Sequence, residues 1–198
     1  MTGGKLLPFK RVHGTAAELS DRALVSAVAE GDQVALGALF DRFHSDVYRF
    51  VAHLVRRDAS SAEDLAQMTF LEAHRSAPRF RGDSTVKTWL FGIATNVVRT
   101  HFRKEHRSNA AKANLEAMPA VQPPAPNEAL SLEQQRRLLT AAVDSLSPGL
   151  REVYVLCVIE EVPGKEAAQI LGIREASVYR RLSDARTALR AAIEEMQA

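Results

Sequence analysis

The sequence predicts an all-α protein made of two small helical domains joined by a flexible, proline-rich linker. Apolar residues recur at spacings of three and four along most of the chain, and no useful stretch alternates with the period of a strand. Four of the eight prolines fall between Pro119 and Pro126, where they remove backbone donors and block helix formation. The 198 residues are enough for two domains that each bury a modest core.

Residues 20–107 are expected to form the first domain, which begins with two capped helices after an N-terminal extension over residues 1–19. Ser20 is suited to cap a first helix that ends at Gly31. Asp32 is suited to cap the second helix. The apolar residues of this second helix, at helical spacing, are Leu36, Leu39, Phe40, Phe43, Val47, Phe50, Val51 and Leu54.

Two more helices are expected to complete this domain. The segment Ser60–Glu63 matches a capping box and predicts the start of a third helix. Pro78 and Gly82 bracket a short loop, and Ser84 is expected to start a long fourth helix that runs towards Arg107. The residues expected to face the core from the third helix are Leu65, Met68 and Leu71.

The linker is predicted at residues 108–129 and the second domain at residues 130–198. A helix is expected from Leu130 to Leu146, and Ser147-Pro148 then combines a cap with a proline at the first helical position. Two further helices are expected to meet at a turn at Gly172, because glycine readily adopts the left-handed conformation that ends a helix.

Composition and cysteine content narrow the class of protein. With 46% hydrophobic and 25% charged residues, the chain is neither collagen-like, mucin-like nor wholly disordered. The single cysteine, Cys157, cannot form an internal disulfide. No apolar run approaches the ~20 residues that cross a bilayer, and the N-terminus lacks the core of a signal peptide. These features predict a cytoplasmic protein.

The sequence carries no motif of a catalytic or metal site. Gly164-Lys165 is followed by Glu166, so a phosphate-binding loop is absent, and no HExxH, GxSxG or GxGxxG pattern occurs. His101 and His106 are five residues apart, a poor spacing for two ligands on one helix. We therefore expect no enzyme activity, no catalytic residue, no metal and no cofactor. Cys157 lies in an apolar stretch and is expected to be a small core residue.

The charge distribution matters more than its total. A formal net charge of +2 argues by itself against a nucleic-acid partner, but from Arg75 to Arg107 eight basic residues oppose two acidic ones, a local net charge of +6. Phe80, Trp89 and Phe91 lie among these cations. Cations neutralise phosphates and flat rings stack on exposed bases, so the segment suits nucleic acid, single strands included. The alternative is a solvated helix face over an aromatic core, in which Trp89 and Phe91 could not both be buried.

The spacing of Ala168, Gly172 and Val178 is typical of a helix-turn-helix. The small alanine lets two helices approach, the glycine permits the tight turn, and the valine packs the second helix, expected from about Glu175 to the end, onto the first. A plain helical hairpin is the alternative. Basic residues near and along the second helix favour DNA binding; they are Arg174, Arg180, Arg181, Arg186 and Arg190.

Six segments carry a further pattern. They are Asp64–Leu71, Phe80–Ser84 and Thr88–Asn96 in the first domain, and Leu146–Pro148, Arg151–Val153 and Glu166–Ile173 in the second. In this order they resemble the bacterial extracytoplasmic-function (ECF) sigma factors, the group 4 members of the sigma-70 family. The resemblance covers about residues 20–107, as region 2, and 130–190, as region 4. It implies a promoter-specificity subunit that directs core RNA polymerase to −35 and −10 promoter elements and helps to open the DNA.

The resemblance also implies roles for particular residues of region 2. One helix would dock on the clamp of the largest polymerase subunit, and the loop after it would hold a base flipped out of the −10 element. The residues implied in polymerase binding are Asp64, Leu65, Gln67 and Phe70. Those implied in −10 DNA binding are Arg79, Phe80, Arg81, Gly82, Asp83, Trp89, Asn96, Arg99 and Arg103.

In region 4 the resemblance implies that the last helix enters the major groove at the −35 element. Several positions depart from the family pattern: Thr100 replaces an aspartate, Glu161 a glycine and Pro163 a Ser/Thr cap, and Asp184 stands where a basic residue is common. These departures bear on promoter sequence more than on membership of the family. The residues implied in −35 binding are Arg174, Ser177, Tyr179, Arg180, Arg181 and Ser183; Tyr179 also stands at an often basic position.

The expected partners are core RNA polymerase, promoter DNA and an anti-sigma factor, with no direct membrane insertion. When polymerase is absent, the face of region 2 that docks on polymerase and the apolar inner surface of region 4 need to be shielded from water. The two domains are therefore expected either to close on each other or to wrap around an inhibitor. Two other functions remain open at this point. One is a stand-alone helix-turn-helix regulator, and the other is a decoy that occupies polymerase without initiating.

Overall fold

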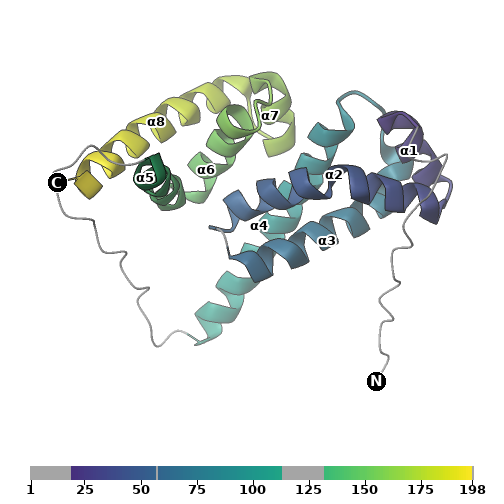
Figure 1. Cartoon of the computed structure of the whole chain (residues 1–198), viewed down its shortest axis with the longest axis horizontal. Helices are drawn as coiled ribbons and strands as arrows, with labels where there is room; N and C mark the ends of the chain where they lie inside the picture. The colour runs from purple at the N-terminus through teal and green to yellow at the C-terminus, as the bar shows by residue number, and fades with distance from the viewer. Residues whose placement is uncertain (1–18, 57, 113–131, 198) are drawn as a thin grey trace.

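The computed structural model describes residues 19–56, 58–112 and 132–197, and within these ranges the chain is helical without any strand, which confirms the all-α prediction. Figure 1 shows two helical groups, α1–α4 and α5–α8, lying against each other. In chain order the elements are α1 (Asp21–Ala29), α2 (Gln33–Leu54), α3 (Ala59–Ser76), the 3₁₀ helix η2 (Ala77–Arg79), α4 (Val86–Lys112), α5 (Leu132–Ser145), α6 (Pro148–Tyr154), the π-helical turn η3 (Val155–Ile159), α7 (Gly164–Leu171) and α8 (Glu175–Gln197).

Helices α1 to α4 pack around a core of aliphatic and aromatic side chains. Phe50 of α2 and Phe91 of α4 are fully buried and stack with ring centroids 4.3 Å apart. Trp89, by contrast, is half-buried and packs against the edge of this core, so only Phe91 of the two rings is fully buried. Ser20 and Asp32 accept hydrogen bonds from the first turns of α1 and α2, as predicted.

Three predicted boundaries were wrong in this domain. Helix α3 is capped by Asp58, whose carboxylate accepts bonds from the amides and hydroxyls of both following serines, Ser60 and Ser61, so the capping box predicted at Ser60 does not form. Helix α4 is capped by the Thr85 hydroxyl, which accepts from the Thr88 amide at 3.0 Å, and not by Ser84. The same helix continues to Lys112, into the first part of the predicted linker. The rest of that linker, like residues 1–18, lies outside the described residues.

The predicted core face of α3 was right for Leu65, which is buried, and wrong for two other residues. Met68 and Leu71, expected to face the core, are 44% and 50% exposed. The buried stripe of α3 instead combines Leu65 and Phe70 with small residues, which let α3 approach α2 and α4 closely. The large apolar side chains of this helix are therefore divided between the core and the surface.

The second domain contains the predicted helix-turn-helix. Helices α7 and α8 meet at Gly172, which has a φ of +66° and ends α7 in the left-handed conformation. Ala168 and Val178 are buried on the two sides of this turn. Pro148 occupies the first turn of α6, as predicted. A smaller core between α5 and α8 includes Leu146 and Leu189.

The two domains share an interface. Buried residues of α2 and α4 form one continuous apolar cluster with buried residues of η3, α7 and α8. Within this contact Gly92 of α4 lies near Ile170 of α7, and a Cβ at Gly92 would lie 3.9 Å from the Ile170 Cγ1. This closed arrangement is one of the two expected when polymerase is absent.

Candidate nucleic-acid and protein interfaces

The loop between η2 and α4 presents aromatic and charged groups together. Phe80 and Trp89 are both partly exposed, and their ring centroids lie 4.9 Å apart at an interplanar angle of 42°. Gly82 has a φ of +74°, and its carbonyl accepts a hydrogen bond from Arg22 of α1, which holds the loop in place. The flanking side chains of Arg79, Arg81 and Asp83 are exposed. An aromatic pair among free cations is a suitable platform for an unpaired base.

Farther along α4, Asn96 and Arg103 are exposed on the surface. The Arg103 guanidinium donates to the Thr100 hydroxyl at 3.0 Å and to the Arg99 carbonyl at 3.3 Å. Thr100 therefore orients Arg103 without neutralising it. The cation remains available to a phosphate.

Arg99 has a different environment, because residues of the second domain contact its side chain. Its Nε and Nη2 donate to the two carboxylate oxygens of Glu152 on α6 at 2.8 and 2.7 Å, and its Nη1 donates to the Leu171 carbonyl at 3.3 Å. The hydrogen bonds to Glu152 raise the pKa of Arg99 above its ordinary value. The guanidinium thus binds a planar anion in the way that it would bind a phosphate.

A second ionic contact lies between the domains at Glu160. The side chain of this glutamate is only 2% exposed and lies 3.4 Å from Nε of Arg49 and 3.2 Å from Nζ of Lys87, both in the first domain. A buried carboxylate needs such partners, because desolvation penalises an unpaired charge heavily. Sequence reasoning missed this contact, since no local pattern links residues so far apart.

The helix-turn-helix places most of the predicted −35 residues on its surface. Arg174, Tyr179, Arg180 and Ser183 are exposed, whereas Ser177 and Arg181 are partly buried. The Arg174 carbonyl accepts bonds from the amides of Ser177 and Val178, so Arg174 stands just before the first turn of α8. Asp184 is exposed as well.

The predicted polymerase-binding residues divide into two groups. Asp64 and Gln67 are exposed on α3, but Leu65 and Phe70 are 2% and 1% exposed. Leu65 and Phe70 therefore support the helix from within, and a partner cannot reach them without unfolding the core. The exposed Met68 and Leu71 provide apolar surface on this helix instead.

Comparison with known proteins identifies the family. Residues 39–108 match the model of sigma-70 region 2, and residues 136–189 match sigma-70 region 4. The ECF RNA polymerase sigma factor SigC of Mycobacterium tuberculosis is 34% identical over 167 residues, which cover 84% of this chain and 88% of SigC. The chain is an ECF sigma factor of the sigma-70 family.

Other relatives agree with this assignment. The ECF RNA polymerase sigma-E factor of Escherichia coli K12 is 30% identical over 180 residues, which cover 87% of this chain and 93% of that protein. CnrH, solved in complex with the cytosolic domain of CnrY, superposes with a TM-score of 0.62 at 26% identity over 88% of this sigma factor and 97% of CnrH. RpoE of Bartonella quintana, solved with the anti-sigma factor NepR, gives a TM-score of 0.62 at 26% identity over 78% and 94% of the two chains.

This ECF sigma factor is accordingly a promoter-specificity subunit of RNA polymerase, with DNA-binding regions 2 and 4. Among the described residues no group of three His, Cys, Asp or Glu side chains is placed to hold a metal ion. Cys157 is half-buried, and burial raises the pKa of its thiol. The helices of the described ranges include none that is long and apolar enough to cross a membrane.

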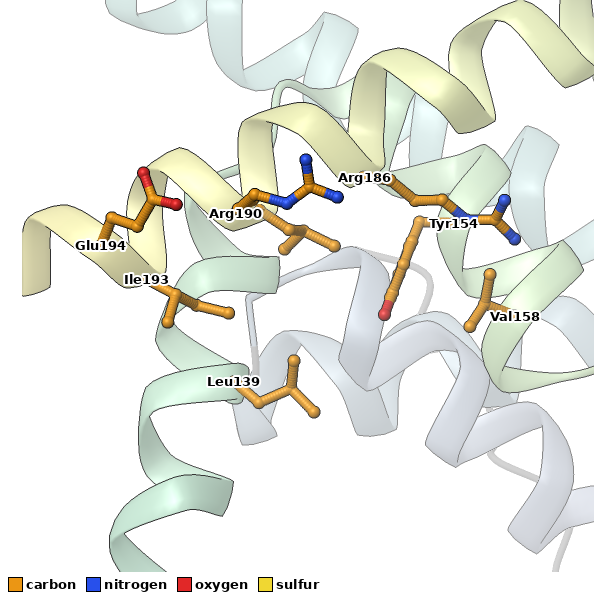
Figure 2. A pocket seen from close by; sticks show the side chains of 8 residues that line it. Leu139, Tyr154, Val158, Arg186, Arg190, Ile193 and Glu194 are labelled. Atoms are coloured by element: carbon orange, nitrogen blue, oxygen red, sulfur yellow. The ribbon is translucent and has the colours of Figure 1, made fainter. Parts of the chain in front are cut away.

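Region 4 of the sigma factor also carries a hollow that the sequence did not indicate. Figure 2 shows it between α5, the α6–η3 segment and α8, with a volume of about 460 Å³. Its lining is mostly apolar, with two arginines and a glutamate at the α8 side. The lining residues are Leu139, Tyr154, Val158, Arg186, Leu189, Arg190, Ile193 and Glu194. Leu139 and Val158 are 48% and 38% exposed, although residues of this type are usually buried.

Proposed function

We propose that this sigma factor opens −10 DNA with the Phe80–Trp89 pair and the loop residues 79–83. The observation that carries the proposal is the partly exposed aromatic pair, whose Phe80 belongs to a loop with exposed cations that the Arg22–Gly82 hydrogen bond anchors. Extruding a base from a duplex costs a few kcal/mol, and stacking on an aromatic side chain contributes about 1–3 kcal/mol per base. A loop that stabilises the extruded base therefore selects sequence and favours melting. Asn96, Arg99 and Arg103 bind the adjacent strand.

The −35 element is contacted by α8 in the major groove. Exposed Arg180 is suited to a guanine edge, and Ser183 lies on the same exposed stretch of the helix. Arg174, before the helix starts, is suited to a phosphate. Ser177 and Arg181 are partly buried, so only the exposed part of each side chain contacts the −35 DNA.

Polymerase is contacted by α3. The exposed Asp64 and Gln67 supply polar contacts, and Met68 and Leu71 supply the apolar area that the predicted Leu65 and Phe70 cannot supply because they are buried. Exposed apolar residues flanked by polar ones are typical of protein interfaces.

Transcription in vitro separates this function from the two alternatives. Initiation from a promoter only when core polymerase and this chain are both present supports a sigma factor. DNA binding without core polymerase would instead support a stand-alone regulator, and core binding without initiation would support a decoy.

Arg180→Ala is expected to reduce initiation from a −35-dependent promoter about tenfold, because one good base contact discriminates by about 1–3 kcal/mol. The −10 preference should not change. Arg136→Ala, which removes an exposed cation from α5, is the matched control. An unchanged promoter choice in Arg180→Ala would contradict the placement of α8 in the groove.

The hollow of Figure 2 is the proposed docking place of an anti-sigma factor. CnrH and the Bartonella RpoE were each solved with a bound partner, CnrY and the anti-sigma factor NepR respectively. An apolar floor with Arg186 and Arg190 at its edge suits an amphipathic helix that carries acidic residues. The sigma factor purified from cells grown under non-inducing conditions should carry such a protein. The Leu139→Asp variant should be purified without it. Recovery of polymerase alone would contradict the proposal.

A further inference from the structure

Tyr179 of the recognition helix lies against the start of α7, where a glycine leaves space for it. A Cβ placed on Gly164 would lie 2.7 Å from Oη, 2.9 Å from Cζ and 3.3 Å from Cε1 of Tyr179. Real side chains do not approach so closely, so the observed position of the ring depends on the missing side chain at Gly164. The position of the Tyr179 ring on α8 therefore depends on which residue stands at the start of α7.

Tyr179 is also held from its own helix. Its hydroxyl donates to Oε1 of Glu175, one turn earlier, at 3.3 Å. The negative charge of Glu175 raises the pKa of the Tyr179 phenol, so the ring remains a neutral hydrogen-bond donor at ordinary pH. The side chain is nevertheless 56% exposed, and its neighbour Arg180 is exposed as well. The ring therefore has a defined place and an open face.

The start of α7 has no side-chain cap and follows a residue in an uncommon conformation. Pro163 precedes α7 and makes no side-chain capping bond. Glu161 has a φ of +54°, a conformation that residues other than glycine rarely adopt. The Tyr179 ring therefore lies against a helix start that its own segment leaves without a side-chain cap.

We propose that Gly164 is a positioning residue for −35 recognition, and that it directs the Tyr179 ring onto a base edge instead of a phosphate. This inference rests on the proposed role of α8 at the −35 element. The Tyr179 hydroxyl, which could otherwise donate to a phosphate, already donates to Glu175, whereas the apolar edge of the ring suits the methyl group of a thymine in the major groove. The predicted ligand is therefore a thymine at one −35 position.

The substitution Gly164→Ala tests this coupling without disturbing the fold. The atoms that would clash belong to the outer end of an exposed side chain, so the ring can swing away instead of forcing the backbone to move. We expect initiation by the holoenzyme on promoters randomised at −35 to lose discrimination for thymine by about fivefold at one position. The −10 preference and the melting temperature of the protein should stay the same.

A double-mutant cycle provides the readout that a purely structural role would not change. Tyr179→Ala identifies the base position that the ring contacts, and in that background Gly164→Ala should have no further effect. The matched control is Gly149→Ala at the start of α6, where a Cβ would lie 3.6 Å from Nη1 of Arg181, an ordinary contact. This control should retain the wild-type preference.

Two outcomes would overturn the inference. In the first, Gly164→Ala keeps the wild-type −35 preference, or changes it equally with and without Tyr179. In the second, Tyr179→Ala leaves every base preference intact while Arg180→Ala alters one, so that α8 still contacts the −35 element but Tyr179 does not. If neither Tyr179→Ala nor Arg180→Ala alters a preference, the proposed role of α8 itself is wrong.

Discussion

A sigma factor that carries Glu152→Gln and Glu160→Gln is expected to bind single-stranded −10 DNA about tenfold more tightly than the unaltered chain when no polymerase is present. In the closed arrangement both carboxylate oxygens of Glu152 occupy Arg99, and Glu160 holds Arg49 and Lys87. DNA must displace Glu152 before Arg99 can bind a phosphate. The glutamine amides remove both negative charges while conserving shape.

The size of this effect follows from the ionic contacts. A charge-assisted hydrogen bond contributes about 1.5–3 kcal/mol, and partial exposure of Arg99 reduces that by solvent screening. A loss of about 1.4 kcal/mol from the closed state changes its population relative to the open state about tenfold. Titration of a fluorescent −10 oligonucleotide measures the affinity, and small-angle scattering measures the expansion of the chain.

Two controls separate opening of the chain from a simple change of charge. The double variant Glu30→Gln with Glu195→Gln also removes two negative charges, but from exposed positions. It should change the affinity for DNA little. Gly92→Cys with Ile170→Cys, in a Cys157→Ala background, places two thiols across the domain contact. The resulting disulfide should abolish the gain in affinity until it is reduced. Equal affinities in all these variants would mean that Glu152 and DNA do not compete for Arg99.

Arg151→Met is expected to lower the free energy of unfolding by about 3 kcal/mol or more. Arg151 is 2% exposed, and burial lowers the pKa of its guanidinium. It donates to the carbonyls of Val143, Asp144, Leu146 and Leu54, at 3.2, 2.8, 2.6 and 3.2 Å. Methionine fills similar space but leaves these acceptors without a donor.

Urea unfolding followed by circular dichroism measures this change. Arg151→Lys keeps the charge but not the planar fork of donors, so it should fall between the wild type and Arg151→Met. Arg79→Met, at an exposed position, should change stability by less than about 0.5 kcal/mol. A loss below about 1 kcal/mol for Arg151→Met would show that water or a rearrangement satisfies the four carbonyls.

Local sequence patterns predicted the helices well and their starting points less well. Ser20, Asp32 and Gly172 act as predicted. Before α3 and α4, several residues able to cap stand side by side, and Asp58 and Thr85 act in place of Ser60 and Ser84. Spacing alone does not decide between neighbouring caps, since each is compatible with a helix that starts one or two residues apart.

The candidate site residues, like the helix boundaries, were predicted only in part. The exposed Arg79, Arg81, Asn96 and Arg180 lie on surfaces where the resemblance implied DNA contacts. On α3 the spacing of the large apolar residues predicts Leu71 in the core, but small residues line much of the buried stripe and Leu71 is exposed. Separately, the resemblance implied that Phe70 contacts polymerase, whereas Phe70 is buried.

By itself the sequence determined the all-α class, the two helical regions and the family, because periodicity, caps and motifs are properties of neighbouring residues. Only the tertiary structure decided which cations are free. Arg99 and Arg103 are one helical turn apart, yet the first binds Glu152 of the other domain and the second remains exposed. The ion pair between Arg99 and Glu152, which are 53 positions apart, depends on how the two domains dock. No pattern of neighbouring residues predicts it.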